Sequence, residues 1–508
     1  MVSFWRNIAF RFYLKHFFSP EFTAEKSLRD QQQILNQLCR ELSPTQLGAK
    51  LGLGHISTYE EFRNKIPVTQ YDFYEPYIAR IMAGEKSVMS SGVVKWLAKT
   101  AGTTSGKSKL IPITSRIIHR NHVRGVFFSL SKIHQIHQDF HLLNHKTLLL
   151  PGGIYETLPV SGITIGDISA IMALNVPFLY RSFYVPDLKT QTRPDWEGKL
   201  EQTVRQIIHE DVGTLSGVPT WHLATLQKMM HHVSFHKLTD VWKNLRLFIH
   251  GGVSFEPYRQ QFEEIAGRTD FIFYEVYNAT EGFFGIQKNS TGGDLLLLTE
   301  NDIFYEFIPL RKYTTGNLEA IPLSEVEINI PYALLITASN GLVRYVVGDV
   351  LTFTNLHPFS FRITGRTQEY INAFGEDLLL ANVENALMKA CQISSCSVKE
   401  YTVAPFYINM QSKGRIQFLI EFSKAPENLK DFELNLDEQL KRENSNYAQK
   451  RSNNLALAPL ELLSAPEGTF YRWMFAQNKL GGQNKVPRLV NGRRVMEELL
   501  QVIEQNIS

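Results

Sequence analysis

A stretch of small and hydroxyl-bearing residues between Lys99 and Thr114 has the composition of a phosphate-binding loop. It reads KTAGTTSGKSKLIPIT. Gly102 and Gly106 permit positive φ and a close approach of the backbone to an anion. Hydroxyl donors come from Thr100, Thr103, Thr104, Ser105 and Ser108, and positive charge comes from Lys107 or Lys109. The stretch predicts a loop that holds the phosphates of a nucleotide.

Two other interpretations of this loop have to be weighed. Gly106-Lys107-Ser108 resembles the end of a P-loop, but that motif needs four residues between its glycines, and Ala101 occupies the required position. Pro112 also interrupts the helix that a P-loop places after its lysine. A flexible linker has the same composition and is the second alternative. The rest of the chain decides, according to whether it supplies the other parts of a nucleotide site.

A second segment with chemical potential is Tyr277–Gly282, which reads YNATEG at the end of an apolar run. Tyr277 can stack on adenine, and Thr280 or Glu281 can reach a phosphate or its Mg²⁺. The alternative is a hairpin turn with a solvated glutamate.

Three single residues lie near other strand ends or in an exposed loop. Asp349 follows an apolar run, where its two oxygens can accept both ribose hydroxyls. Arg366 follows another strand and can grip ribose or phosphate with its fork of donors. Lys485 lies in the glycine-led loop GGQNKVPR and can stabilise charge during adenylyl transfer. Taken singly, each also fits a turn residue or a solvated surface residue.

Alternating helices and strands must position these residues. Apolar spacing predicts helices over 24–49, 115–140, 199–210 and 221–232, and strands over 146–150, 211–220, 245–249 and 271–277. Pro67 and Pro76 predict short helices joined by turns over 59–82. Two strands end in small residues, at His250-Gly251-Gly252 and at Asn278–Gly282. Ligands of open α/β sheets bind beyond the carboxyl ends of strands, so we expect both ends to line one crevice with the loop.

The second half of the chain has a different pattern. Closely spaced strands over 294–353 predict antiparallel pairing or a small barrel. The polar, turn-rich segment 366–375 predicts a domain boundary. Beyond it, helices over 382–390 and 429–442 and strands over 400–403 and 415–422 predict a small α+β lobe. The fold class is therefore α/β, with a large N-terminal domain over 1–365 and a small α+β domain over 376–508.

Composition excludes several classes of protein. The 508 residues are 44% hydrophobic and 20% charged, and a net charge of +3 gives no reason to expect nucleic acid or an anionic membrane as the main partner. The chain contains three cysteines and no run of eighteen uncharged apolar residues, which predicts a cytoplasmic protein without a membrane span. Its fifteen histidines lack the spacing of a metal site.

Taken in order, these segments resemble the auxin-responsive Gretchen Hagen family of acyl acid amido synthetases, adenylate-forming enzymes, in the form found outside plants. The family's phosphate loop resembles Thr100–Lys109, and its Tyr-x-x-[Ser/Thr]-Glu-Gly motif resembles Tyr277–Gly282. Its Arg-Tyr-x-x-Gly-Asp motif resembles Arg344–Asp349. The resemblance extends over nearly the whole chain. Two departures are Thr100-Ala101, where the family has a pair of serines, and Gln368-Glu369, where related ligases carry the acidic hinge.

The resemblance implies a site for ATP and Mg²⁺. The phosphates would be held by Thr103, Thr104, Ser105, Gly106 and Lys109. The adenine, the ribose and the α-phosphate would be surrounded by Gly252, Tyr277, Asn278, Thr280, Asp349 and Arg366. Glu281 would hold Mg²⁺. Lys485, carried by the small domain, and Lys109 would be the catalytic residues.

The implied reaction has two steps: a carboxylic acid becomes acyl-AMP with release of pyrophosphate, and an amine, an amino acid in this family, then displaces AMP. Rotation of a mobile C-terminal domain about 366–375 would separate the steps. A monomer is expected, with an acyl pocket lined by 151–183 and 213–223. Transfer to the thiol of coenzyme A is one alternative, and a member that binds nucleotide or acyl acid without turnover is another.

Overall fold

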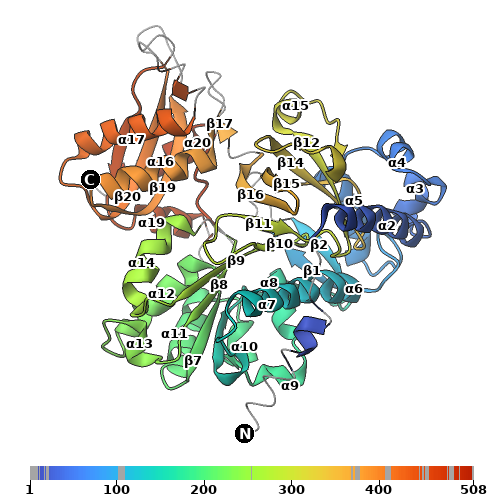
Figure 1. Cartoon of the computed structure of the whole chain (residues 1–508), viewed down its shortest axis with the longest axis horizontal. Helices are drawn as coiled ribbons and strands as arrows, with labels where there is room; N and C mark the ends of the chain where they lie inside the picture. The colour runs from blue at the N-terminus through green and yellow to red at the C-terminus, as the bar shows by residue number, and fades with distance from the viewer. Residues whose placement is uncertain are drawn as a thin grey trace. The chain divides into compact units, whose positions relative to one another are not determined.

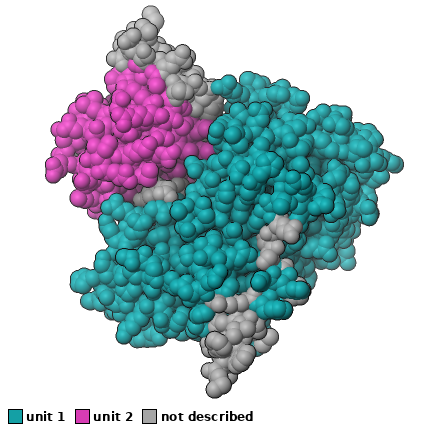
Figure 2. All heavy atoms as spheres, in the orientation of Figure 1, with its two compact units in different colours: residues 1–101, 107–347, 352–362 teal, residues 102–106, 348–351, 363–508 magenta. Residues whose placement is uncertain are grey.

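The protein is described by a computed structural model that covers residues 10, 12–16, 18, 22–100, 109–252, 255–367, 370–371, 378–406, 414–444, 447–448, 451, 457–477, 479, 485–490 and 492–505. The chain divides into two compact units (Figure 2). Unit 1 comprises residues 1–101, 107–347 and 352–362, and unit 2 comprises residues 102–106, 348–351 and 363–508.

A twelve-stranded sheet with strand order β13-β12-β14-β15-β16-β11-β10-β9-β8-β7-β3-β6 dominates the fold (Figure 1). Five neighbouring strands are parallel: β6 (Tyr184–Val185), β3 (Lys146–Leu150), β7 (Val212–Gly217), β8 (Leu247–His250) and β9 (Ile272–Asn278). Leu215 pairs with Leu148 on one side and with Phe248 on the other. All three are buried, as expected for parallel strands covered on both faces.

Helices accompany the parallel strands (Figure 1). They are α8 (Ile168–Leu174), α9 (Phe178–Arg181), α10 (Leu188–Gln191), α11 (Trp196–Ile207), α12 (Pro219–Met230), α13 (Leu238–Val241) and α14 (Glu256–Ala266). Asp195 fixes the start of α11 by accepting the N–H of Gly198 at 2.7 Å. Trp242 and Phe262 pack with Phe248 in the core between helices and sheet. The predicted alternation of helices and strands is confirmed here.

The strands that follow β9 continue the same sheet. They are β10 (Phe283–Gln287), β11 (Leu295–Leu297), β12 (Ile303–Pro309), β13 (Ile321–Pro322), β14 (Pro331–Ala338), β15 (Tyr345–Leu356) and β16 (Phe359–Arg366), with α15 (Leu310–Thr314) after β12. Pairing is antiparallel from β9 through β10 and β11 to β16, and among β13, β12 and β14. The prediction of antiparallel strands over 294–353 is confirmed.

The N-terminal helices are shorter than the spacing predicts. They are α2 (Ala24–Leu42), α3 (Gln46–Leu51), α4 (Tyr59–Lys65) and α5 (Tyr71–Met82). The predicted helix over 24–49 is interrupted because Thr45 caps a new helix by accepting the N–H of Gly48 at 2.9 Å. A break at Pro67 is confirmed, but a break at Pro76 is wrong. Pro76 lies inside α5, whose burial of Tyr74, Tyr77, Ile78 and Ile81 outweighs the hydrogen bond lost at proline.

A second, four-stranded sheet carries the predicted phosphate loop. Its order is β2-β1-β5-β4, with β1 (Val94–Lys99), β2 (Leu110–Thr114), β5 (Thr164–Gly166) and β4 (Ile154–Thr157). The chain then enters α6 (Ser115–Ile117), the π-helical turn η2 (Ile118–Val123) and α7 (Arg124–Ile136). A helix after the loop was predicted, and the strand β2 comes first.

Unit 2 contains both helices and strands beyond residue 378, in the part of the chain where an α+β lobe was predicted. Its three-stranded sheet contains β19 (Ser397–Phe406), β20 (Arg415–Lys424) and β21 (Glu461–Ala465), and its helices are α16 (Leu380–Ile393), α17 (Leu429–Glu443), α19 (Thr469–Ala476) and α20 (Arg494–Glu504). Alternation along β19 sends Val403 into the core with α16 and α17, and Ala404 into a second core with α19 and α20. The short strands β17 (Tyr370–Ile371) and β18 (Leu378–Leu379) pair with each other.

Candidate active site

The strands β1 and β2, which flank the predicted phosphate loop in sequence, pair antiparallel with each other. Residues Thr103, Thr104, Ser105 and Gly106 lie outside the described residues. At the base of the loop, the N–H of Thr100 donates to the carbonyl oxygen of Lys109 at 2.9 Å, next to the Lys99–Leu110 pair. The Lys109 ammonium lies 5.6 Å from the ring centroid of Tyr71. The described residues on either side, Thr100 and Lys109, therefore lie next to each other at the end of this strand pair.

A buried polar network that was not predicted from the sequence lies beside this strand pair. β5 pairs with β1, and Asp167 follows it directly. The Asp167 carboxylate accepts the N–H of Gly153 at 2.7 Å and the hydroxyl of Tyr155 at 2.8 Å, and burial raises the pKa of Asp167. The Lys99 ammonium lies 4.8 Å from the Tyr155 ring. Gly153 in the PGG sequence after β3 was the only sequence signal for this network.

Lys199 is a second buried polar residue that was not predicted from the sequence. It lies on α11 with 3% of its surface exposed, and its ammonium donates to the backbone carbonyls of Pro151, Gly152 and Gln191. Burial lowers the pKa of Lys199 to about 8. The lysine thus fixes the loop that follows β3. A lysine in an amphipathic helix normally faces solvent, so the sequence pattern alone could not reveal this role.

The Tyr277–Gly282 segment is a tight turn between β9 and β10. The N–H of Ala279 donates to the carbonyl of Gly282 at 2.9 Å. A hairpin turn was the alternative interpretation, and it is correct for the backbone, but a solvated glutamate is wrong: Glu281 is only 7% exposed and Thr280 only 5%. Glu281 is therefore a carboxylate held at a strand end, a group of the kind that Mg²⁺ uses as a ligand.

The ends of β8 and β9 lie side by side. β8 pairs in parallel with β9, so that His250 lies opposite Glu275. Gly251 allows this close approach, because a Cβ there would lie 2.3 Å from the carbonyl oxygen of Val276. Gly252 follows with φ +81°, a conformation that favours glycine. The structure therefore brings Gly252 to the same sheet edge as the Tyr277–Gly282 turn.

Tyr277 and Asn278 differ in their surroundings. The Tyr277 ring packs edge-on against Phe284, at 5.0 Å between centroids, and against Phe361 at 6.1 Å, and is almost fully buried. Asn278 ends β9, and its Oδ1 lies 2.9 Å from Nδ1 of His122 on η2. His122 is another residue that the sequence analysis did not select, because a histidine within a helical pattern carries no distinguishing signal.

Asp349 and Arg366 belong to unit 2 and form an ion pair. Nε of Arg366 donates to Oδ1 of Asp349 at 3.0 Å, from β16 to β15. The N–H of Thr367 donates to the carbonyl of Gly348 at 2.8 Å and holds the two strands together at this point. The two residues predicted to reach the ribose are therefore neighbours.

Arg344, the first residue of the Arg-Tyr-x-x-Gly-Asp sequence, has a structural position. Its guanidinium is buried, bonds the Glu306 carboxylate at 2.9 Å and donates to the carbonyl of Ile66 at 2.6 Å. Burial raises the pKa of Glu306, and the guanidinium opposes that shift. The arginine backbone adopts φ +47°. Arg344 thus joins the N-terminal helices to the sheet. Asp349 of the same motif lies further along, on β15.

Lys485 lies on unit 2 at the edge of the described residues, since residues 480–484 are not among them. Its side chain is exposed, while Val486 is buried in the core formed with α19 and α20. Thr402 donates its hydroxyl to the carbonyl of Pro487 at 2.7 Å, and Val403 bonds Arg488 through the backbone at 2.8 Å. The lysine therefore extends from a firmly anchored segment.

Of the predicted site residues, unit 1 contains Lys109, Gly252, Tyr277, Asn278, Thr280 and Glu281, and unit 2 contains Asp349, Arg366 and Lys485. Among the described residues, no three His, Cys, Asp or Glu side chains gather as a metal-binding cluster. Mg²⁺ fits Glu281 nonetheless, because this ion is commonly held by one or two carboxylates together with substrate phosphates. In the part of the chain that the structure describes, no helix is both long and apolar enough to cross a membrane.

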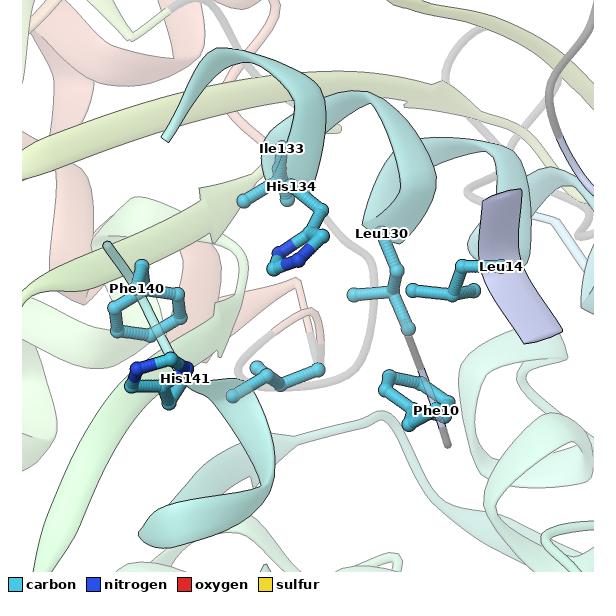
Figure 3. A pocket seen from close by; sticks show the side chains of 8 residues that line it. Phe10, Leu14, Leu130, Ile133, His134, Phe140 and His141 are labelled. Carbon is cyan, nitrogen blue, oxygen red and sulfur yellow. The ribbon is translucent and has the colours of Figure 1, made fainter. Parts of the chain in front are cut away.

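A small pocket elsewhere in unit 1 contains none of these residues. Mostly apolar side chains and two histidines line it, among them Leu130, Ile133 and Phe140 (Figure 3). Its volume of about 20 Å³ is room for a water molecule and not for an organic acid. We assign it no part in the chemistry.

Three buried histidines of unit 1 predict acid sensitivity. Burial lowers the pKa values of His122 and His222 to about 4 and that of His250 to about 3. Below the ordinary pKa near 6.5 the unfolded chain takes up protons that the folded chain does not. Each histidine should therefore lower the free energy of unfolding by about 1.4 kcal/mol per pH unit as pH falls from about 6 towards 4. Urea titrations at about pH 7 and about pH 5 measure this loss.

His222→Phe supplies the control for this prediction. Phenylalanine keeps the aromatic contact with Phe248, whose ring centroid lies 4.9 Å from that of His222, but it cannot be protonated. The variant should lose less stability than the wild type between the two pH values. An unchanged pH dependence would show that His222 does not contribute.

The comparisons with known proteins agree along most of the chain. Models of the GH3 family N-terminal domain match residues 21–203 and 196–271, the central domain model matches 296–366, and the C-terminal domain model matches 381–494. The chain is 23% identical to an indole-3-acetic acid-amido synthetase of Arabidopsis thaliana, covering 92% of this chain and 90% of the relative. It is also 23% identical to a jasmonoyl-L-amino acid synthetase of Nicotiana attenuata, covering 94% and 93%.

Two solved structures share the fold. An acyl acid amido synthetase in complex with 2,4-DB matches with a TM-score of 0.78 at 16% identity, covering 98% of this chain and 96% of the other. A 2-hydroxyisobutyryl-CoA ligase in its postadenylation state matches with a TM-score of 0.57 at 12% identity, covering 94% and 91%. The chain therefore has the fold of adenylate-forming ligases with a C-terminal domain, as predicted.

Proposed function

The chain belongs to the GH3 family, and on that premise we propose that it is an ATP-dependent acyl acid amido synthetase. It activates a carboxylic acid as acyl-AMP and transfers the acyl group to an amine, with an amino acid as the acceptor. The observation that carries the proposal is the sheet edge where Gly252, Asn278 and the buried Glu281 lie together. Relatives named as an indole-3-acetic acid-amido synthetase and a jasmonoyl-L-amino acid synthetase, which align over at least 90% of both chains, support it.

In the first step a carboxylate oxygen attacks the α-phosphorus of ATP, the bond to the bridging oxygen breaks, and pyrophosphate leaves. The loop residues Thr103, Thr104, Ser105, Gly106 and Lys109 hold the phosphates, and Asp349 and Arg366 hold the ribose. Gly252, Tyr277, Asn278 and Thr280 surround the adenine and the α-phosphate. Lys485 stabilises charge at the phosphorus, and Glu281 holds Mg²⁺, which supplies neutralisation of phosphate charge.

In the second step the amine attacks the acyl carbonyl, the bond to AMP breaks, and the nitrogen loses a proton. Between the steps the C-terminal domain turns about residues 366–375. Within that segment, Arg366 forms an ion pair with Asp349, and the short strand β17 pairs with β18, which lies just after the segment. We place the enzyme in the cytoplasm as a monomer.

Acid-dependent exchange of labelled pyrophosphate into ATP tests this function. We expect exchange with at least one member of a broad carboxylate panel, because formation of acyl-AMP is reversible. AMP release should then depend on added amino acid, and mass analysis should find the amide. Release that depends on coenzyme A instead would make the protein a thioester-forming ligase. No exchange with any acid would indicate a member that binds without turnover.

A further inference from the structure

His122 is a buried imidazole with one nitrogen that the described residues leave without a partner. Its side chain is fully buried on the π-helical turn η2. Nδ1 lies 2.9 Å from Oδ1 of Asn278, whereas Nε2 has no hydrogen-bond partner in the described part of the chain. Leaving a buried polar atom unpaired destabilises a fold, so an unpaired atom in a native structure needs an explanation. Beside a predicted site residue, a hydrogen bond to a bound ligand is one such explanation.

The neighbours of His122 fix its position. Asn121 accepts the N–H of Phe283 at 2.7 Å and donates its amide to the carbonyl of Asn301 at 2.7 Å. Gly125, on α7, packs against the ring of Phe283, so closely that a Cβ there would lie 2.4 Å from the ring. These contacts attach η2 to the β9–β10 turn. The imidazole is therefore held in place, on a helix type that is frequent at functional sites.

Met172 determines which nitrogen of His122 carries the proton. The amide nitrogen of Asn278 lies 3.6 Å from Sδ of Met172. A thioether sulfur accepts hydrogen bonds but cannot donate, so the amide nitrogen faces the sulfur and the amide oxygen faces the imidazole. Nδ1 of His122 therefore donates to Asn278, and Nε2 carries a lone pair. Because burial lowers the pKa of His122 to about 4, the ring is neutral near pH 7.

We propose that His122 is a specificity residue that accepts, at Nε2, a hydrogen bond from a hydroxyl or ring N–H group of the acid substrate. This inference rests on the proposed function. Asn278 is assigned there to the α-phosphate, where the carboxylate reacts, and Met172 lies in the segment 151–183 predicted to line the acyl pocket. The preferred substrates are therefore carboxylic acids that carry a hydrogen-bond donor, and plain hydrocarbon acids are poor substrates.

Matched pairs of acids that differ in the donor test this proposal. Indole-3-acetate is compared with benzothiophene-3-acetate, 4-hydroxybenzoate with 4-methoxybenzoate, and 12-hydroxydodecanoate with dodecanoate, by pyrophosphate release. In the wild type the donor-bearing acid of at least one pair should have a kcat/KM more than about tenfold higher. His122→Phe should reduce that ratio to about one, mainly through loss with the donor-bearing acid. His119→Leu, which removes an exposed imidazole from the same turn, should keep it.

Equal kcat/KM within every pair for the wild type, or a preference that survives in His122→Phe, would overturn the proposal. His122→Gln is the second variant, because it keeps a polar group in this buried position. The glutamine amide oxygen can still accept a hydrogen bond, so this variant should retain part of the ratio. A purely structural histidine would change the rates with both acids equally and leave the ratio unchanged.

The proposed function and this inference can fail separately. If no acid supports pyrophosphate release, the function fails, and calorimetric binding of the same pairs to the full chain tests His122 directly. Tighter binding of the donor-bearing acid, lost in His122→Phe, supports the assignment, whereas equal binding or none overturns it. ¹⁵N NMR of the histidine ring gives an independent readout: Nε2 should be unprotonated in the free protein and should shift when a donor-bearing acid is added.

Discussion

Lys485→Ala should lower acid-dependent ATP–pyrophosphate exchange by about 100- to 1000-fold, the usual loss when one preorganised contact to a transition state is removed. ATP binding should change little, because the ammonium acts on charge that develops only during the reaction. The setting of the residue supports this result. Its side chain is exposed, and the backbone behind it is anchored through buried Val486 and the bond from Val403 to Arg488. Alanine should therefore remove the charge without disturbing the fold.

Exchange rates and equilibrium ATP binding, measured on the same preparations, decide this prediction. Lys430→Ala is the matched control, because that lysine lies on α17 of the same unit, its side chain is 71% exposed, and it forms an ion pair with nearby Glu433. It should exchange at the wild-type rate. A parallel loss of ATP affinity and exchange in Lys485→Ala would make Lys485 a binding residue without a special role in the transition state.

Removing one member of the Arg344–Glu306 pair should cost about 3–5 kcal/mol of folding free energy, since it leaves a buried charge uncompensated. Both side chains are nearly inaccessible, with 4% and 1% exposed. Arg344→Met would leave the Glu306 carboxylate with the hydroxyl of Tyr59 at 3.1 Å. Urea unfolding of the purified variants measures the loss.

The double variant Arg344→Met with Glu306→Leu distinguishes an ion pair from simple packing. Because it removes both charges, it should be markedly more stable than either single variant. Additive losses would instead indicate that the two side chains stabilise the fold independently. Arg344 belongs to the Arg-Tyr-x-x-Gly-Asp motif, but its side chain contacts the segment between the N-terminal helices. A loss of activity in Arg344→Met should therefore be compared with the loss of stability in the same variant.

The periodicity of the sequence was sufficient to predict most elements, because burial on one or both faces of a strand or helix leaves a direct pattern of apolar residues. The parallel strands β3, β7, β8 and β9 and the lobe strands β19 and β20 all lie where apolar runs predicted them. The exceptions have local causes. Thr45 starts a new helix inside a continuous apolar pattern, and Pro76 is tolerated where tertiary burial outweighs its cost.

The predicted site also contains features that the sequence indicated and features that it did not. Glycines and compact motifs were informative, since Gly251 and Gly252 are required where two strand ends approach. Burial was not predictable from the residue types of the motif: Glu281 could have been solvated, and the edge-on contact of the Tyr277 ring with Phe284 left no signal in the sequence. Polar partners from distant segments, such as Lys199 under the PGG loop and His122 beside Asn278, left no pattern at all.

The sequence by itself determined the order of the elements, the fold class and the motifs by which the family is identified, because each depends on neighbours within a few residues along the chain. Only the tertiary structure decided which side chains are desolvated and which nitrogen or oxygen they meet. Those contacts join separate segments of the chain, more than a hundred positions apart in the case of His122 and Asn278, and their energies come from burial, which no local pattern encodes.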